Sequence, residues 1–288
     1  MKKVTVILIL LLFILSGCSP NAPAQIAATT LPVYEFTELL CQGTGITVTR
    51  LVTENVSCLH DYSLQVTQMR AIEKAEVVIL SGAGLEGFLT DAMHSAAHVI
   101  DASAKIELLC GHEHEHSHEG HHHEEDPHIW LSPENAKLMC QNIYEGLIML
   151  YPQHQAQLLE NLNALLRRLD ALQQHGETAL QNLSQRELIT FHDGFAYFAE
   201  SFDLHILKAV EEESGSEASA KSLIELIDFV ESHNLSAVFT ETNGSTSAAQ
   251  VIARETGAKV FTLDMAMSGN SYFDAMYYNI NTIKEALG

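Results

Sequence analysis

The chain has 288 residues, with 15 lysines and arginines against 37 aspartates and glutamates, and its formal net charge is −22 at pH 7. A hydrophobic share of 47% excludes both a disordered acidic tail and a multi-span membrane protein, and the length suffices to bury the core of one large or two ordinary domains. Such acidity argues against nucleic-acid binding, because phosphates would be repelled, and favours a cationic partner.

The chain begins like an exported protein. Lys2 and Lys3 precede an apolar run at 4–15, which is too short for a membrane-spanning helix of ~20 residues and fits a secretory signal peptide. The sequence Leu-Ser-Gly-Cys at 15–18 resembles a bacterial lipobox, in which cleavage precedes the cysteine and the cysteine is lipidated. We expect a signal peptide at 1–17, a lipidated Cys18 on a tether at 18–24, and a location on the outer face of the cytoplasmic membrane or in the periplasm. An ordinary signal peptide with a chance cysteine is the alternative.

Four further cysteines lack the C-x-x-C spacing of thiolate metal sites and redox motifs: Cys41, Cys58, Cys110 and Cys140. Export permits disulfides, and four cysteines allow three pairings. Cys41–Cys58 and Cys110–Cys140 would close the shortest loops, and free buried thiols are the alternative.

From residue 25, short apolar runs alternate with amphipathic segments. Strands are predicted at 26–29, 46–52, 77–80 and 98–100, with helices at 34–40, 64–73 and 85–97. This alternation indicates a parallel sheet with helices on both faces.

The middle of the chain has no strand signal. A helix is predicted at 133–150, where Ser132 is a cap and Pro133 a first-turn residue. A second begins at Pro152 and reaches about residue 183, with leucines spaced 4, 3, 4 and 3 apart from Leu158 to Leu172. Thirty helical residues span ~45 Å, enough to pack against both halves of the chain. We expect the helix to bend or fray at Gly176. Glutamine and asparagine dominate over charged pairs, which argues against a coiled-coil dimer and favours a monomer.

The second half repeats the alternation. Strands are predicted at 188–191, 205–210, 237–240 and 259–262, with helices at 194–201, 218–233, 245–255 and 271–287. The predicted fold class is therefore α/β: two doubly wound (βα)4-type lobes, at 25–150 and 184–288, joined by a long backbone helix at 151–183. The carboxyl ends of the strands should border a crevice between the lobes.

Three histidines occupy comparable turns near this crevice. His60 follows the second predicted strand, His128 lies in Asp-Pro-His-Ile-Trp-Leu-Ser-Pro at 126–133, and His192 directly follows a strand. Neutral imidazoles suit Zn²⁺, and three of them with one further donor complete a tetrahedron. Any one of them alone would more often be a structural histidine. Each also has a neighbouring carboxylate as a partner for its other ring N–H: Asp61, Asp126 and Asp193.

Short motifs spread over nearly the whole mature chain resemble those of a known protein family. They are LHDY at 59–62, AEVVI at 75–79, GLE at 84–86, DPHIWLSP at 126–133, FHDGF at 191–195, FTE at 239–241 and ARETG at 253–257, of which the fourth is the most specific. The chain resembles the zinc-binding solute-binding lipoproteins of ABC transporters, in the high-affinity zinc-uptake branch. The resemblance implies His60, His128 and His192 as metal ligands, rigid lobes bridged by a long helix, and an ABC permease as partner. In manganese-binding relatives the His192 position is typically a carboxylate, so histidine there favours zinc.

The fourth ligand stays open. Many relatives place an acidic ligand shortly before the last helix, where this chain has Asn270. A neutral amide leaves the charge of Zn²⁺ uncompensated in a crevice of low dielectric. The alternatives to Asn270 are water or hydroxide and a carboxylate from Glu54, Glu241 or Asp264.

Residues 111–126 read GHEHEHSHEGHHHEED, with seven histidines and six carboxylates. The absence of apolar periodicity predicts a low-complexity loop that binds zinc weakly through shifting sets of side chains; a merely solvated loop is the alternative. The candidate auxiliary ligands are His112, His114, His116, His118, His121, His122 and His123. The H-E-x-x-H spacing of metalloproteases also occurs here, but that motif needs a docked helix, and nothing apolar would dock one.

The sequence therefore predicts an extracytoplasmic receptor that is not an enzyme and delivers Zn²⁺ to an ABC permease. A zinc-buffering or adhesin-type surface lipoprotein without a transport role is the alternative. A zinc hydrolase would require an open metal position and a general base.

Overall fold

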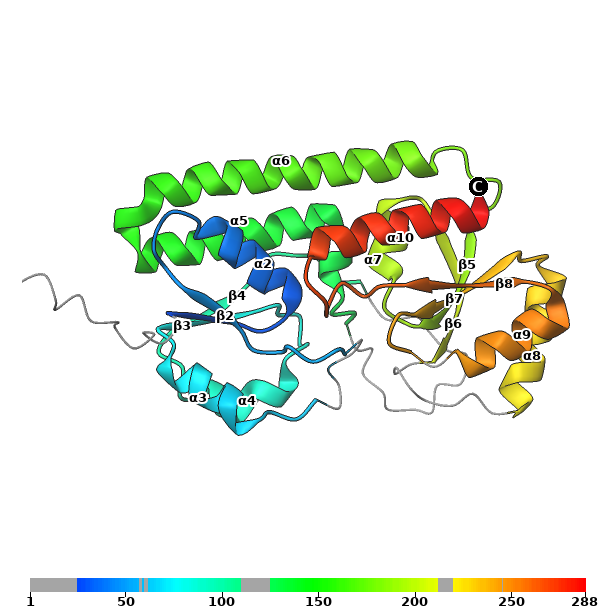
Figure 1. Ribbon diagram of the computed structural model, residues 1–288, viewed down its shortest axis with the longest axis horizontal. Coiled ribbons are helices and arrows are strands. Elements are labelled where there is room, and N and C mark those ends of the chain that lie inside the picture. Colours follow the sequence, from blue (N-terminus) through cyan, green and yellow to red (C-terminus); the bar gives the residue numbers. More distant parts are fainter. Residues whose placement is uncertain (1–24, 57–58, 60–61, 110–124, 212–219, 245) are drawn as a thin grey trace, which may run out of the picture.

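The computed structural model describes residues 25–56, 59, 62–109, 125–211, 220–244 and 246–288. The predicted signal peptide, Cys18, His60, Cys110 and residues 111–124 of the histidine-rich segment lie outside this part of the chain. Within it the chain forms two parallel four-stranded sheets at opposite ends of an elongated molecule (Figure 1). These sheets confirm the predicted α/β class.

The first sheet has the strand order β2-β1-β3-β4. Its strands are β1 (Ile26–Ala28), β2 (Val48–Arg50), β3 (Val77–Leu80) and β4 (Val99–Asp101). Alternate residues of the inner strands enter different cores because helices cover both faces. Ile26 and Val77 pack with α2 (Leu31–Leu40), whereas Ala27 and Val78 pack with α3 (Val66–Lys74).

The second sheet repeats this order as β6-β5-β7-β8. Its strands are β5 (Glu187–His192), β6 (His205–Glu211), β7 (Ala237–Glu241) and β8 (Lys259–Leu263). Its helices are α7 (Ala196–Ser201), α8 (Ala220–Ser232), α9 (Ser247–Thr256) and α10 (Tyr272–Leu287). In both sheets the first strand has neighbours on either side that come later in the chain. The connections therefore diverge at β1 and at β5, and the carboxyl end of such a strand is where ligands bind in open α/β sheets.

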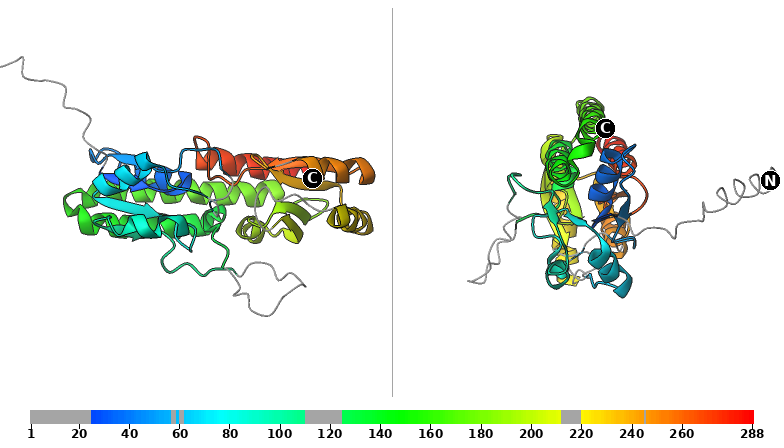
Figure 2. Two further views of the ribbon diagram at one scale, coloured as in Figure 1. Left: turned by 90° about the horizontal axis from the view of Figure 1, so that it is seen from below. Right: turned by 90° about the vertical axis from the view of Figure 1, so that its left-hand side faces the viewer.

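A layer of long helices joins the two sheets. α5 (Pro133–Leu150) and α6 (Gln155–Leu180) run side by side, and α6 also contacts α2 and α10, so that it extends along both halves of the molecule (Figures 1 and 2). Its leucine stripe is buried, and each such side chain contributes ~1.5–3 kcal/mol. One apolar cluster includes residues of both sheets together with this layer. The lobes are therefore joined through a common core.

α6 continues through Gly176 to Leu180, so the expected fraying of the helix at Gly176 is wrong. Gly176 is buried, and a Cβ at this position would lie 2.2 Å from Cε1 of Phe202. The glycine thus lets the Phe202 ring approach the helix backbone.

The helix predicted at 85–97 is also wrong. A 3-10 turn at Gly87–Leu89 leads instead into the four-residue α4 (Thr90–Met93). The Glu86 carboxylate is buried and accepts hydrogen bonds from the Thr29 hydroxyl and the Ser81 and Gly82 N–H groups, which holds the chain in a tight turn. Burial raises the pKa of Glu86 to about 7 against the opposing effect of these three donors.

The described cysteines are free thiols. Cys41 and Cys140 are both buried in the main core and neither is in a disulfide, so the pairings Cys41–Cys58 and Cys110–Cys140 are absent. Both thiols face apolar side chains, and burial raises the pKa of Cys41 to about 12.

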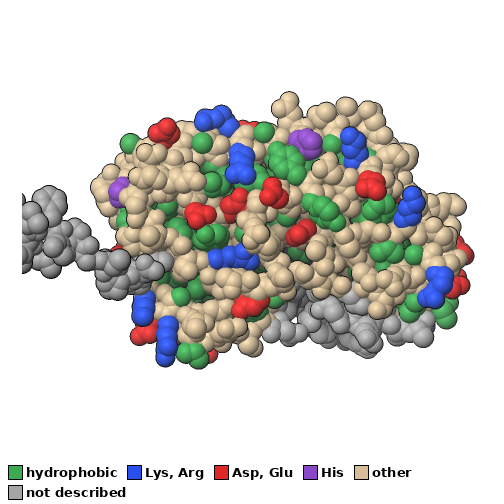
Figure 3. Space-filling model, in the orientation of Figure 1, with side chains coloured by type: hydrophobic (Ala, Val, Ile, Leu, Met, Phe, Trp, Pro, Cys, Tyr) green, Lys and Arg blue, Asp and Glu red, His purple; other side chains and the backbone are tan. Residues whose placement is uncertain are grey.

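The surface mixes charges of both signs. On the face shown in Figure 3, acidic and basic side chains are interspersed over the described residues. None of the helices in the described ranges is long and apolar enough to span a membrane.

Replacing Gly176 by Ala tests the helix–ring contact. The higher helix propensity of alanine favours the variant by ~1 kcal/mol, whereas forcing a methyl group against Phe202 costs ~1–3 kcal/mol. We expect a lower melting temperature by thermal denaturation. In a Phe202→Leu background the same change should cost less or stabilise the protein. An equal loss in both backgrounds would contradict the contact.

Candidate metal centre

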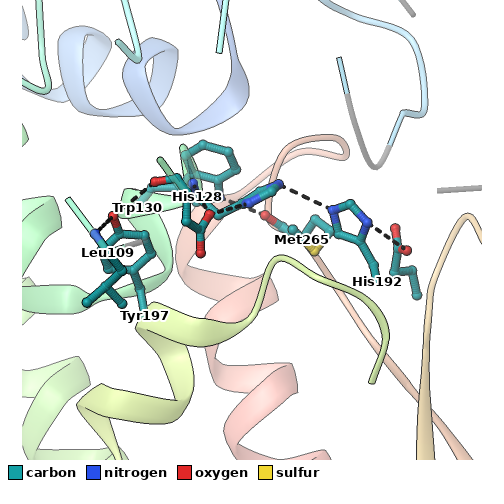
Figure 4. A network of polar contacts seen from close by, with 8 residues as sticks. Leu109, His128, Trp130, His192, Tyr197 and Met265 are labelled. Atoms are coloured by element: carbon teal, nitrogen blue, oxygen red, sulfur yellow. Dashed lines mark hydrogen bonds and ion pairs between the residues drawn. The ribbon is translucent and has the colours of Figure 1, made fainter. Parts of the chain in front are cut away.

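Two buried histidines from different parts of the fold meet at the carboxyl end of the second sheet. His192 is the last residue of β5, and His128 directly precedes the 3-10 turn at Ile129–Leu131 that leads into α5. The Nε2 atoms of the two rings lie 3.3 Å apart, and the side chains are 2% and 1% exposed for His128 and His192 (Figure 4). The structure thus brings together two of the three predicted histidines.

A carboxylate lies on the Nδ1 side of each ring. Asp126 Oδ1 is 2.7 Å from His128 Nδ1 and also accepts the backbone N–H of His128. Glu241 Oε1, at the end of β7, is 3.8 Å from His192 Nδ1, and both of these side chains are buried. A carboxylate at Nδ1 favours the ring proton there, which leaves the Nε2 lone pair for another partner.

The distance between the two Nε2 atoms fits a shared metal ion. Two nitrogens bound to one tetrahedral zinc at ~2.0–2.1 Å lie ~3.3 Å apart. Without an ion, the same distance allows a hydrogen bond in which one ring carries its proton on Nε2 and donates to the other ring. The carboxylates of Asp126 and Glu241 supply negative charge behind the rings, where it offsets the charge of a divalent cation. Imidazole nitrogens with oxygen donors suit Zn²⁺ among the common biological metals.

Gly194 keeps the face of His192 open. A Cβ at Gly194 would lie 2.7 Å from His192 Cδ2, 2.9 Å from its Nε2 and 2.8 Å from Met265 Cε. Any side chain at this position would therefore displace the ring or cover its ligating nitrogen.

Tyr197 and Trp130 hold the His128 segment in place. The Tyr197 hydroxyl donates to the Asp126 carbonyl and accepts the Leu109 N–H, both at 2.9 Å (Figure 4). The Trp130 indole stacks edge-on against His128 and donates to the Met265 carbonyl at 2.7 Å. The sequence reasoning did not single out Gly194, Tyr197 or Met265. Of these three residues, only Gly194 could have been recognised from the sequence, because it is a glycine two residues after a candidate ligand.

The third predicted histidine, His60, and its neighbour Asp61 lie outside the described residues, as do His112, His114, His116, His118, His121, His122 and His123. Within the described ranges, no group of three or more His, Cys, Asp or Glu side chains is placed to hold a metal ion. The site as described is therefore a pair of imidazoles with their carboxylates.

The alternative oxygen donors differ in their surroundings. The Glu54 carboxylate accepts hydrogen bonds from the Tyr62 hydroxyl, the Gln65 amide and the Thr53 N–H, and the bond from Tyr62 lowers its pKa. These three donors already occupy both of its oxygens.

Glu241 is the last residue of β7, and Asp264 directly follows the adjacent strand β8. Glu241 approaches His192 from the Nδ1 side, opposite to the ligating Nε2. Asp264 Oδ1 accepts the Ala266 N–H at 2.7 Å, and burial raises the pKa of Asp264. Asn270 is exposed just before α10, and its side chain makes no hydrogen bond to another described residue.

Comparisons with known proteins agree on one group. The family model described as "Zinc-uptake complex component A periplasmic" matches residues 26–286. A protein of Treponema pallidum (strain Nichols) whose name describes it as metal-binding is 30% identical over 95% of this chain and 93% of its own length. The zinc-binding lipoprotein AdcA of Streptococcus pneumoniae serotype 4 is 28% identical over 99% of this chain, which spans 61% of AdcA. A crystal structure of ZnuA superposes with a TM-score of 0.81 at 33% identity, covering 91% of this chain and 98% of that chain.

Proposed function

The chain belongs to the family of zinc-uptake complex component A periplasmic proteins, and on this premise we propose that it is the extracytoplasmic receptor that delivers Zn²⁺ to an ABC permease. The observation that carries the proposal is the 3.3 Å separation of the Nε2 atoms of His128 and His192. It matches two ligands of one tetrahedral zinc ion.

In this proposal zinc is cargo, and each residue has a distinct role. His128 and His192 bind the ion through Nε2, and His60 is the third ligand. Asp126 and Glu241 keep the ring protons on Nδ1 and balance the charge of the ion from behind the ligands. Glu241 thereby acts on the metal through His192 rather than as its fourth ligand.

The fourth position belongs to Asn270, with Asp264 or a water molecule as alternatives. Asn270 lies in the segment between β8 and α10, on the second lobe. Its exposure leaves the side chain available to turn toward an incoming ion.

Three further features complete the proposed function. A lipid on Cys18 keeps the protein at the outer face of the cytoplasmic membrane, and the receptor acts as a monomer without enzymatic activity. The histidine-rich segment at 111–126 holds additional zinc weakly and increases its local concentration.

Replacing His192 by Ala tests the central assignment. Removing one ligand should weaken the tight zinc site by at least ~100-fold, since changes to residues that merely support ligands already cost 10–100-fold. Titration calorimetry with a competing chelator measures this. The matched control is His205→Ala on the same sheet, whose side chain is exposed and should leave the affinity unchanged. An unchanged dissociation constant in His192→Ala would refute the assignment.

Deleting residues 113–125 tests the role of the histidine-rich segment. Weak zinc equivalents should disappear and one tight site should remain, because His128 and His192 lie outside the deletion. The measurement is the stoichiometry of zinc per protein by calorimetry. Loss of the tight site would show that the segment provides a ligand rather than an auxiliary store.

Replacing Asn270 by Asp tests the fourth ligand. A carboxylate in direct contact with the ion should tighten zinc binding by about tenfold, since it adds a charged donor to a set of neutral ones. The matched control is Asn281→Asp, which adds the same charge at an exposed position of α10. Equal effects of the two variants would exclude Asn270 from the ligands.

A further inference from the structure

The segment that joins β8 to α10, residues 264–271, is held by donors from outside it. The Asp264 carbonyl accepts from Asn279 of α10, and the Met265 carbonyl from the Trp130 indole. The carbonyls of Met267 and Gly269 both accept from Arg50. Four carbonyl groups of this short segment are thus bound by side chains, and Trp130 and Arg50 precede the second lobe in the chain.

Of these hydrogen bonds, those from Arg50 join residues that are farthest apart along the chain. It is the last residue of β2 in the first sheet, and its side chain reaches 219 positions along the chain to Gly269. Nη1 donates to the Gly269 carbonyl at 2.8 Å, Nη2 to the Met267 carbonyl at 3.2 Å, and Nε to the Val52 carbonyl of its own lobe. A planar guanidinium presents the donors for these bonds from three nitrogens in a fixed fork, whereas an ammonium group has all its donors on one nitrogen.

The segment does not adopt its conformation without cost. Ala266 has φ 54° and Gly269 has φ 87°, both in the left-handed region, and Ala266 carries a Cβ there. A left-handed backbone conformation of this kind persists where contacts from the surrounding structure hold it in place. The bonds from Arg50 and Trp130 are such contacts.

The same segment touches the surroundings of both ligands. Met265 Cε and His192 Cδ2 both border the place that a Cβ of Gly194 would occupy, and the Met265 carbonyl is bound by the indole that packs edge-on against His128 (Figure 4). Asp264 and Asn270, the candidate oxygen donors, stand at either end of it.

We propose that Arg50 is a positioning residue of the zinc site: by binding the Met267 and Gly269 carbonyls across the lobes, it fixes the segment 264–271 and so slows zinc release. The inference rests on the proposed zinc-binding function. Arg50 itself does not touch the ion.

The test compares Arg50→Gln with Arg186→Gln. Arg186 also binds backbone carbonyls through its guanidinium, those of Leu180 at the end of α6 and of Phe202 and Asp203, but it lies just before the start of β5, whereas His192 is at the end of that strand. Both variants should lower the melting temperature. Zinc dissociation from each full-length protein is followed by stopped flow into excess chelator, well below either melting temperature. We expect about tenfold faster release from Arg50→Gln and an unchanged rate from Arg186→Gln.

Arg50→Lys separates positioning from folding. Lysine keeps the positive charge but can make at most part of the hydrogen bonds of Arg50. The zinc release rate of Arg50→Lys should therefore fall between those of the original protein and of Arg50→Gln. If Arg50→Gln does not fold, the release rate of Arg50→Lys decides the test. Release rates of the Arg50 variants within twofold of Arg186→Gln would overturn the proposal. A failure of the proposed zinc-binding function would give another result: the unaltered protein would bind no zinc tightly, or His192→Ala would bind zinc as tightly as the unaltered protein.

Discussion

Two imidazole nitrogens from different segments, Nε2 of His128 and Nε2 of His192, are held 3.3 Å apart in a buried place. This distance suits two ligands of one tetrahedral zinc ion, and the rest of the fold sets it. β5 places His192 at the point where the connections of the second sheet diverge. The turn before α5 places His128, and the Tyr197 hydroxyl and the Trp130 indole fix that turn.

The common core explains how two lobes maintain so short a distance. α6 packs along both halves, and one apolar cluster includes strands of both sheets. Independent lobes would move relative to each other and vary the distance between the ligands. The ties of Arg50 and Trp130 to the segment before α10 extend this rigidity to the edge of the site.

Part of the negative charge of the protein lies at this site. The formal charge of −22 first indicates only a preference for cations. Asp126 and Glu241 place two buried carboxylates behind neutral imidazoles, so compensation for a divalent ion need not come from a charged ligand. This accounts for how a chain with Asn270 in place of an acidic residue can still balance zinc. Four further carboxylates share residues 111–124 with seven histidines, outside the described residues.

Periodicity in the sequence predicts the parts of this fold that depend on local pattern. The apolar runs locate the strands of both sheets, and the leucine spacing locates α6. The failures at 85–97 and at Gly176 have another origin, because each involves a contact that periodicity does not show: the buried Glu86 carboxylate binds two nearby N–H groups and the distant Thr29, and Gly176 packs against the distant Phe202 ring. Likewise, motifs point to His128 and His192, but the pairing of Glu241 with His192 and the reach of Arg50 follow from tertiary packing. The boundaries at 25–150, 151–183 and 184–288 stay a prediction.

A single zinc ion bound by both histidines can be located by anomalous diffraction at the zinc edge, from crystals of the zinc-loaded protein. We expect a strong peak ~2.1 Å from both His128 Nε2 and His192 Nε2. A fully occupied zinc peak elsewhere, with none between these two nitrogens, would contradict it.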